Sequence, residues 1–253
     1  MKKQFKTVIC VSAIFLLVGF NPISSQSKND TIKNFKNTIR TNITNPLLFG
    51  EKYNVIGYER VTWKNQSVSF NVGRFALPKF SSPVADSLKL LTDFKDKGFT
   101  FAIDYRFYLK KENKYSAPRG VYVGPYYSFN SLERENTWLL NTSGTSETLV
   151  TNMDLNINLI GAQMGYQFVI RNRLAIDLIF FGPGVWFYSV KTSIDTSLDP
   201  EEEAMIFEKI NEMLAAKLPG HEIIITPGEQ DRKSSVQLTS AGFRYLVHLG
   251  FRF

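Results

Sequence analysis

The sequence predicts an all-β fold, an eight-stranded antiparallel up-and-down transmembrane β-barrel with short helices in its long loops. Three observations predict it. Apolar and other residues alternate with a period of two in one segment after another, as in strands whose two faces meet different surroundings. Short and long connections alternate along the chain, as in antiparallel barrels that cross a membrane. The last segment, AGFRYLVHLGFRF, has one apolar face and ends on Phe253.

The chain opens with features of a secretory signal peptide, expected over residues 1–25. Lys2, Lys3 and Lys6 precede an apolar run that is shorter than the roughly 20 residues a membrane-spanning helix needs. An uncleaved anchor or a buried helix is the alternative. Cleavage would remove Cys10, the single cysteine, and three of the seven net positive charges. The mature chain would then have no disulfide or lipid anchor, and a charge too mild for nucleic-acid binding.

A polar lead over 26–37 is expected in the periplasm, followed by a barrel domain over 38–253. Its predicted strands are 39–46, 53–63, 67–77, 98–110, 120–130, 159–170, 174–190 and 241–253. The clearest alternation lies in 98–110. One face there carries Phe99, Phe101, Ile103, Tyr105, Phe107 and Leu109.

The lengths of the connections predict the orientation of the barrel. Short links at 64–66, 111–119 and 171–173 would join neighbouring strands at one end of the barrel. Long loops are expected at 78–97, 131–154 and 191–236, and the short link at 47–52 is the exception. Bacterial outer-membrane barrels have short periplasmic turns and longer extracellular loops. Both ends of the barrel domain are therefore expected on the periplasmic side.

Two of the long loops carry helical patterns. Ser82 and Pro83 are typical of a helix start, and they would begin a helix reaching Phe94. A second helix is expected over 199–220, after Asp199 and Pro200. Its apolar stripe would be Phe207, Ile210, Leu214 and Leu218. This stripe either covers the barrel mouth, which is favoured, or forms a docking face for a partner.

The final strand has the length and pattern expected for a membrane crossing. Phe243 and Phe253 are ten residues apart, which corresponds to a climb of about 25 Å in a tilted strand. Aromatic residues favour both membrane interfaces. The edge strand of a soluble barrel is the alternative interpretation.

The same ending resembles the C-terminal insertion signal of Gram-negative outer-membrane barrels, which the barrel-assembly machinery recognises. The residues that carry the resemblance are Tyr245, Val247, Leu249, Phe251 and Phe253. The chain after residue 25 also resembles uncharacterised eight-stranded barrels of the OmpA transmembrane type with a GYER-like second strand, here Gly57 to Arg60. The resemblance implies a monomer in contact with outer-membrane lipid, and it implies no activity.

Charged residues are expected to point into the lumen, which side chains fill in an eight-stranded barrel. The phase of the strands places six charged or titratable residues there: Asp104, Arg106, Asp177, Arg244, His248 and Arg252. Glu59 joins them under one of two phases that the second strand allows. Buried charges must be paired, so we expect a carboxylate–guanidinium network. A structural plug is favoured over ion conduction.

The sequence offers little support for catalysis or for a cofactor. Lipid-A deacylases of similar size use a His and a Ser two residues apart on a late strand, whereas Gly250 follows His248 at that distance. His221 has no partner at metal-ligand spacing, and no phosphate-binding loop or nucleophile elbow is present. The expected role is therefore structural, or surface contact with an extracellular or lipoprotein partner. A narrow pore or small-ligand-binding barrel is the first alternative, and a lipid-modifying enzyme the second.

Overall fold

The computed structural model describes residues 35–76, 88–113, 115–142, 145–194, 204, 208, 211 and 233–253. These residues form ten strands and one short helix. The strands are Asn37–Asn42 (β1), Val55–Trp63 (β2), Gln66–Gly73 (β3), Leu88–Tyr108 (β4), Gly120–Thr142 (β5), Thr145–Ile170 (β6), Leu174–Phe181 (β7), Pro183–Ile194 (β8), Lys233–Phe243 (β9) and Leu246–Arg252 (β10), and the helix is Thr44–Phe49 (α2). The predicted signal peptide and most of the polar lead lie outside the described residues.

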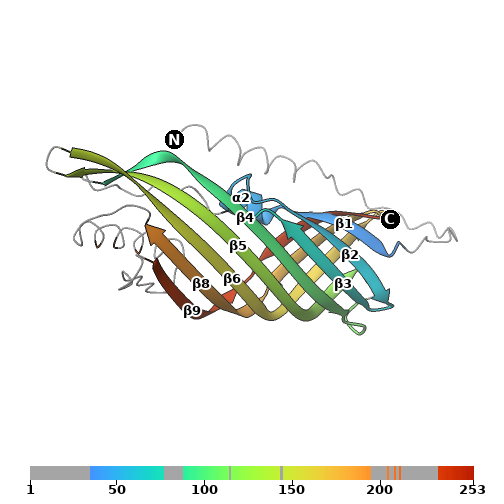
Figure 1. Cartoon of the computed structure of the whole chain (residues 1–253). Coiled ribbons are helices and arrows are strands. Elements are labelled where there is room, and N and C mark those ends of the chain that lie inside the picture. Colours follow the sequence, from blue (N-terminus) through green and yellow to red (C-terminus); the bar gives the residue numbers. More distant parts are fainter. Residues whose placement is uncertain are drawn as a thin grey trace. The chain divides into compact units, whose positions relative to one another are not determined.

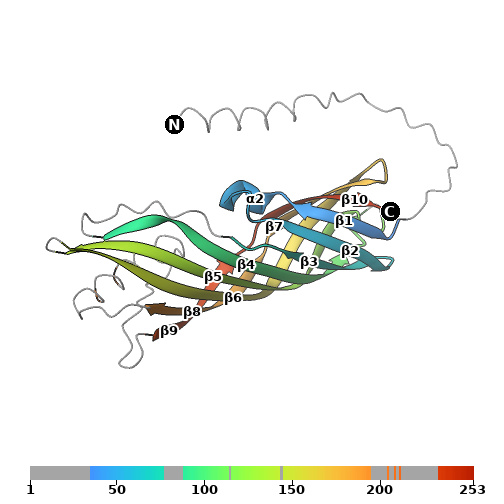
Figure 2. The ribbon, with the colours of Figure 1, turned by 45° about the horizontal axis from the view of Figure 1, so that its top comes forward.

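The ten strands close into a ring with eight positions (Figures 1 and 2). Each strand from β1 to β6 pairs with its successor in antiparallel register. One stretch of β6 pairs with β7 and another with β8, so β8 continues the path of β7. In the same way β9 continues into β10, because β8 pairs with β9 and β7 with β10. Pairing of β1 with β10 completes the ring, which confirms the predicted all-β class and eight-stranded antiparallel ring.

The predicted strands 174–190 and 241–253 are each interrupted, and the two breaks lie next to each other. The first breaks at Gly182, before Pro183, which has no N–H to donate. The second breaks between Phe243 and Leu246, and the Arg244 N–H donates to the Gly182 carbonyl at 2.8 Å. A Cβ on Gly182 would lie 2.8 Å from the Arg244 carbonyl oxygen. The close approach of these two segments therefore requires glycine at position 182.

The ring has two distinct ends. At one, called here the terminal end, Asn37 and Phe253 exchange backbone hydrogen bonds of 3.2 and 2.9 Å. The β2–β3, β4–β5 and β6–β7 turns lie at this end too. In the β6–β7 turn, Arg171 and Asn172 have positive φ angles of 46° and 60°, as a type I′ turn requires, and the Arg173 N–H donates to the Ile170 carbonyl at 3.1 Å. The opposite end carries α2 and is called the α2 end (Figure 1).

Strands extend into segments predicted as long loops. β4 begins at Leu88, so the helix expected to reach Phe94 is wrong from that residue on. β5 and β6 run through most of the predicted loop 131–154 and pair as far as Thr142 with Thr145. Backbone pairing with a neighbouring strand overrides weak local propensity. The buried face of these extensions mixes Leu132 and Trp138 with Arg134 and Asn136, so no apolar alternation marks them as strands.

The short connection between β1 and β2 is helical, contrary to the predicted strand over 39–46. The strand ends at Asn42, whose side-chain Oδ1 accepts a hydrogen bond of 2.8 Å from the Asn45 N–H. This local bond begins a turn, and α2 follows. The Thr44 hydroxyl oxygen accepts from the Val247 N–H at 2.8 Å, which ties the turn to β10. No helix in the described part of the chain is long and apolar enough to cross a membrane.

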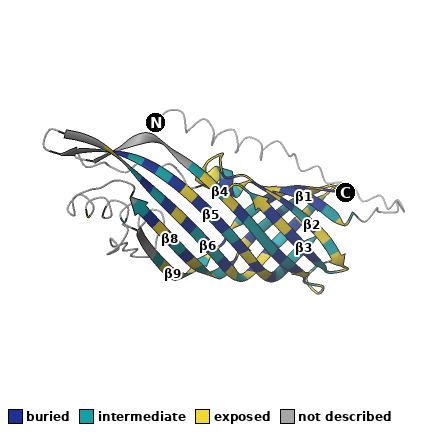
Figure 3. Cartoon of the chain, in the orientation of Figure 1, coloured by how far each residue is buried: buried dark blue, intermediate teal, exposed yellow. Residues whose placement is uncertain are grey.

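Side chains alternate between buried and exposed along the strands, as Figure 3 shows. In β2 the buried residues include Val55, Gly57 and Glu59, while Ile56 and Arg60 are exposed. The buried side faces the space enclosed by the ring, the lumen. The exposed side faces outwards. The two faces differ in chemistry, and this difference defines the candidate site.

Candidate functional site

Charged side chains from several ring positions meet in the lumen. The group, called here the lumen network, consists of Arg40, Glu59, Asp104, Arg106, Asp177, Arg244 and His248. Arg40 lies on β1, Glu59 on β2 and Asp104 and Arg106 on β4. Asp177 lies on β7, and Arg244 and His248 lie just before and within β10. None of the seven is more than 8% exposed. The structure therefore brings together six of the seven lumen residues predicted from the sequence and adds Arg40. The seventh, Arg252, is also buried but donates to Asn172 and to the Phe35 carbonyl at the terminal end.

Arg106 contacts all three carboxylates. Its Nε lies 2.6 Å from Asp104 Oδ1, its Nη2 lies 2.9 Å from Asp177 Oδ2, and its Nη1 lies 3.6 Å from Glu59 Oε1. The guanidinium carbon also lies 4.5 Å from the centre of the Tyr122 ring. Since Asp177 belongs to β7 and Arg106 to β4, this side chain crosses the lumen.

Arg40 crosses the lumen from another direction. Its Nη1 donates to Asp177 Oδ2 at 2.9 Å, and its Nη2 lies 3.5 Å from Asp104 Oδ2. Nη2 also donates to the Ser69 hydroxyl at 2.6 Å. The sequence analysis missed Arg40. A signal was present, since the alternate residues Thr38, Arg40 and Asn42 are all polar. In the structure all three are buried.

Neutral side chains complete the hydrogen bonding of the carboxylates. Tyr122 OH donates to Asp177 Oδ1 at 2.6 Å. Glu59 accepts from Ser67 at 2.6 Å, from Tyr108 at 3.0 Å and from Gln167 at 3.0 Å. These two carboxylates therefore have both arginine and neutral donors nearby, as the burial of a charge requires.

The same holds for Asp104, which accepts from Ser69 at 2.5 Å and from Gln163 at 3.1 Å. Gln163 in turn accepts from Arg244 Nη2 at 2.5 Å, and the Arg244 guanidinium lies 4.1 Å from the Tyr126 ring centre. Arg244 Nη2 is 3.9 Å from Asp104 Oδ2. Arg244 therefore joins the network at its edge, mainly through Gln163.

His248 borders the network on β10. Its Nδ1 lies 3.4 Å from Asp177 Oδ2, and its Nε2 lies 3.3 Å from Asn42 Nδ2. Register pairs His248 with Asp177 on one side and with Asn42 on the other. The imidazole is thus held between two strands next to an already paired carboxylate, an arrangement that suits a structural role.

The lumen network is balanced in charge, and its ion pairs cross the ring. Three guanidinium groups face three carboxylates, and the ion pairs link ring positions that are not neighbours. Burying such charges is costly, and the cost is offset only when geometry and hydrogen bonding are good. In the described part of the chain, no three metal-ligating side chains are grouped so that they could hold a metal ion. What this arrangement does chemically is to hold strands in register across the lumen.

The residues of the predicted C-terminal signal lie on the outer face. Tyr245 is 58% exposed, and Leu249, Phe251 and Phe253 are also exposed, with Val247 half-buried between them. β10 pairs with β1 and β7 at this place. The strand therefore joins the two ends of the sheet.

The predicted docking face and His221 lie outside the described residues. The face comprises Phe207, Ile210, Leu214 and Leu218. Within 199–220 the three described residues, Ala204, Glu208 and Asn211, are helical.

No protein-family model and no curated protein matches this chain. Among solved structures, it is similar to a major outer membrane protein from Thermus thermophilus, at 11% sequence identity and a TM-score of 0.38. The likeness covers 86% of this chain and 98% of that chain. At this score the two folds are only loosely alike, so functional reasoning rests on this chain's own residues.

Proposed function

We propose that this protein is a monomeric outer-membrane β-barrel whose lumen is closed by charged side chains. The observation that carries the proposal is the distribution of residues at the level of the lumen network. Arg106, Asp104 and Glu59 are at most 1% exposed and pair with one another inside the ring. Large apolar residues are exposed instead, and lipid is the solvent that favours them.

The exposed apolar residues recur around the ring. Those on the strands include Ile39, Ile56, Phe70, Val72, Phe99, Phe107, Ile160, Met164, Phe168, Leu174, Phe180, Val185, Phe187, Leu249 and Phe251. A soluble monomer rarely exposes a contiguous apolar patch of more than several hundred Å². In a bilayer the same surface would be solvated, and closure of the ring would leave no unpaired strand edge in hydrocarbon.

The charge-filled lumen supports a structural role in the envelope, or surface contact at the α2 end, over conduction. Side chains of the lumen network contact one another across the ring, which favours a plug. The β5–β6 hairpin projects at the α2 end (Figure 2) and offers a surface to an extracellular or lipoprotein partner. We propose further that this end faces outwards and that the barrel-assembly machinery inserts the chain through β10.

Cell fractionation tests the proposal. The chain, expressed with its first 25 residues in a Gram-negative host, should appear in the outer-membrane fraction. It should migrate faster in gels before heating than after, as closed barrels do when they stay folded. Recovery of the folded chain in the aqueous periplasmic fraction would contradict the proposal.

Conductance separates the plug from the alternative of a narrow pore, which the polar lining of the lumen favours. Purified protein in a planar bilayer should give no stable, large open state. A steady open state would support the pore and contradict the plug. A non-catalytic role also predicts an unchanged lipid-A mass spectrum on overexpression, and a mass shift would support an enzyme.

A further inference from the structure

The terminal end of the ring is strongly basic. Its exposed charged side chains in the described part of the chain are Lys36, Arg60, Lys64, Lys110, Lys111, Glu112, Arg171 and Arg173. Seven of these eight are cationic, and they come from the residue before β1, from β2 and from all three turns. A basic surface of this kind attracts anions.

The α2 end differs, because its charges of opposite sign are matched across strands. Lys97 is in register with Glu133, and Lys191 with Asp154. Arg74 makes an ion pair of 3.1 Å with Asp96. Among the described exposed residues, the excess of positive charge is thus concentrated at the terminal end.

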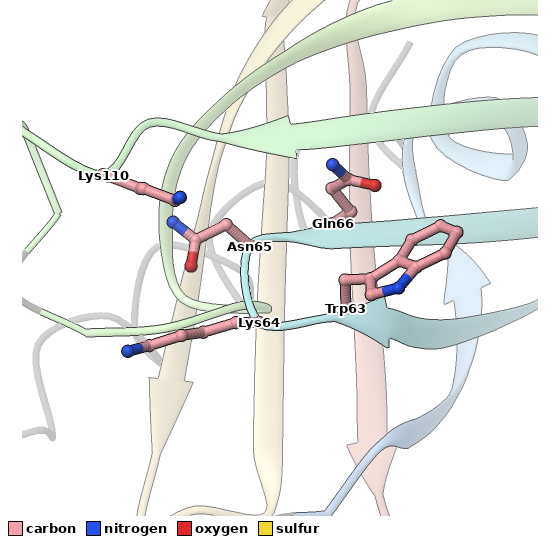
Figure 4. Close-up of a pocket in the computed structure, with 5 residues that line it drawn as sticks. All are labelled: Trp63, Lys64, Asn65, Gln66 and Lys110. Carbon is pink, nitrogen blue, oxygen red and sulfur yellow. The ribbon is translucent and has the colours of Figure 1, made fainter.

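A shallow pocket at the terminal end brings two of the lysines together with an indole. It has a volume of about 420 Å³ and is lined by Trp63, Lys64, Asn65, Gln66 and Lys110 (Figure 4). Trp63 is 65% exposed, and both lysines are exposed. The pocket therefore offers two ammonium groups, side-chain amides and an apolar ring to one ligand.

Backbone hydrogen bonds fix the turn that forms this pocket. The Tyr108 N–H donates to the Asn65 carbonyl at 2.8 Å, and the Ala117 N–H donates to the Lys64 carbonyl at 3.0 Å. The β2–β3 turn is thereby joined to the β4–β5 turn, so Lys64 and Lys110 are carried by connected segments. The backbone positions of the two lysines are therefore fixed relative to each other.

Cations and aromatic rings also lie together elsewhere on this end. The Arg173 guanidinium lies 4.0 Å from the centre of the Phe35 ring, and that of Arg119 lies 4.5 Å from the Tyr115 ring centre. Tryptophan and tyrosine favour the headgroup level of a membrane, and basic residues there attract anionic lipid. Both preferences are met at the same end of the ring.

We infer that the terminal end binds the headgroups of anionic phospholipid, with the pocket of Trp63, Lys64 and Lys110 as its most defined site. The inference rests on the proposed membrane location, since only then do these groups lie at headgroup level. Charge complementarity selects the ligand, because the lysines pair with phosphate while the exposed indole lies against the glycerol and upper acyl region. The leaflet concerned is the one next to the terminal end.

The test compares two lipids on the full-length processed protein, refolded in detergent micelles. Native mass spectrometry would follow retention of dioleoylphosphatidylglycerol and, separately, dioleoylphosphatidylcholine. The variant is Lys64→Gln with Lys110→Gln. The matched control is Lys97→Gln with Lys191→Gln, which removes the same charge from exposed positions at the α2 end. Heat-dependent gel mobility identifies folded samples.

The unaltered protein should retain phosphatidylglycerol in preference to phosphatidylcholine. The Lys64/Lys110 variant should lose about thirtyfold in affinity for phosphatidylglycerol, from the usual contribution of two lysines near an anionic surface. The control should lose less than about threefold. Equal retention of the two lipids, or equal losses in variant and control, would overturn the inference and favour an acidic partner protein for this end.

Flotation with phosphatidylcholine vesicles distinguishes failure of this inference from failure of the proposed function. Protein that floats without any preference for the anionic lipid contradicts the headgroup site alone. Protein that does not float contradicts the membrane location on which the site depends.

Discussion

Asp104 and Arg106 lie two residues apart on the same face of β4 and form a buried ion pair, with Nε 2.6 Å from Oδ1. Here Ser69 and Gln163 donate to Asp104, while Asp177 and Glu59 lie beside Arg106. The pair is therefore the centre of contacts that reach across the ring, and stability should depend on it.

Removing the charge of Arg106 should destabilise the fold strongly. Arg106→Met leaves three buried carboxylates with fewer cations, and breaking a buried pair in this way costs about 3–5 kcal/mol. Urea unfolding of vesicle-inserted protein measures the change. Arg171→Gln, in an exposed turn, is the control and should change the free energy of unfolding by less than about 0.5 kcal/mol. Similar values for the two variants would argue against a structural lumen network.

Arg40 and Asp177 should be coupled, because their side chains approach to 2.9 Å. Arg40→Met and Asp177→Asn should each lower the free energy of unfolding, and the double variant should lower it by less than the sum of the two single losses. The double variant should recover about 0.5–3 kcal/mol relative to the sum of the single losses. Thr192→Val, far along the lumen, should combine additively with Asp177→Asn. Additivity within the Arg40–Asp177 pair would mean that this contact contributes nothing to stability.

Gly165 should be intolerant of a side chain as long as Tyr122 occupies the lumen. A Cβ at position 165 would lie 2.4 Å from the Tyr122 ring and hydroxyl. We expect Gly165→Ala to lower the free energy of unfolding by about 1–3 kcal/mol. The same substitution in a Tyr122→Ala background should cost less but not nothing, because the Cβ would still lie 2.7 Å from the Leu178 carbonyl oxygen. An equal cost in both backgrounds would assign the effect to that carbonyl on β7.

The period-two pattern was sufficient to predict the strands near the lumen network. Asp104 and Arg106 could be assigned to the lumen because Phe101, Ile103 and Tyr105 alternate with them. Glu59 remained ambiguous until pairing of β2 with β3 fixed its phase. The alternation reflects a physical contrast between two environments. It is readable wherever both environments are present.

Where that contrast ends, the sequence was uninformative. The extensions of β5 and β6 beyond Asn130 and before Leu159 contain many charged and polar residues, and their buried face mixes Leu132 and Trp138 with Arg134 and Asn136. Arg40 was missed because β1 is short and flanked by residues of mixed polarity. Its four lumen partners, Ser69, Asn71, Asp104 and Asp177, lie 29 to 137 positions away along the chain. Contacts at such separation depend on ring closure, which local pattern does not encode.

Cysteine labelling should reveal the orientation of the ring. The single native cysteine, Cys10, lies in the predicted signal peptide, so introduced thiols would be the sole targets after processing. Glu51→Cys is exposed at the α2 end, and Arg171→Cys is exposed at the terminal end. A membrane-impermeant maleimide should label the first in intact cells and both after permeabilisation. Labelling of position 171 in intact cells would reverse the proposed orientation.

The central claim is that hydrocarbon solvates the outer face of the ring, where Ile160, Phe187 and Phe251 are exposed. The most direct measurement is refolding of the processed chain with and without phosphatidylcholine vesicles, followed by density-gradient flotation. The account predicts folded protein that floats with the vesicles and aggregates in their absence. A folded, monodisperse monomer in detergent-free buffer would contradict it.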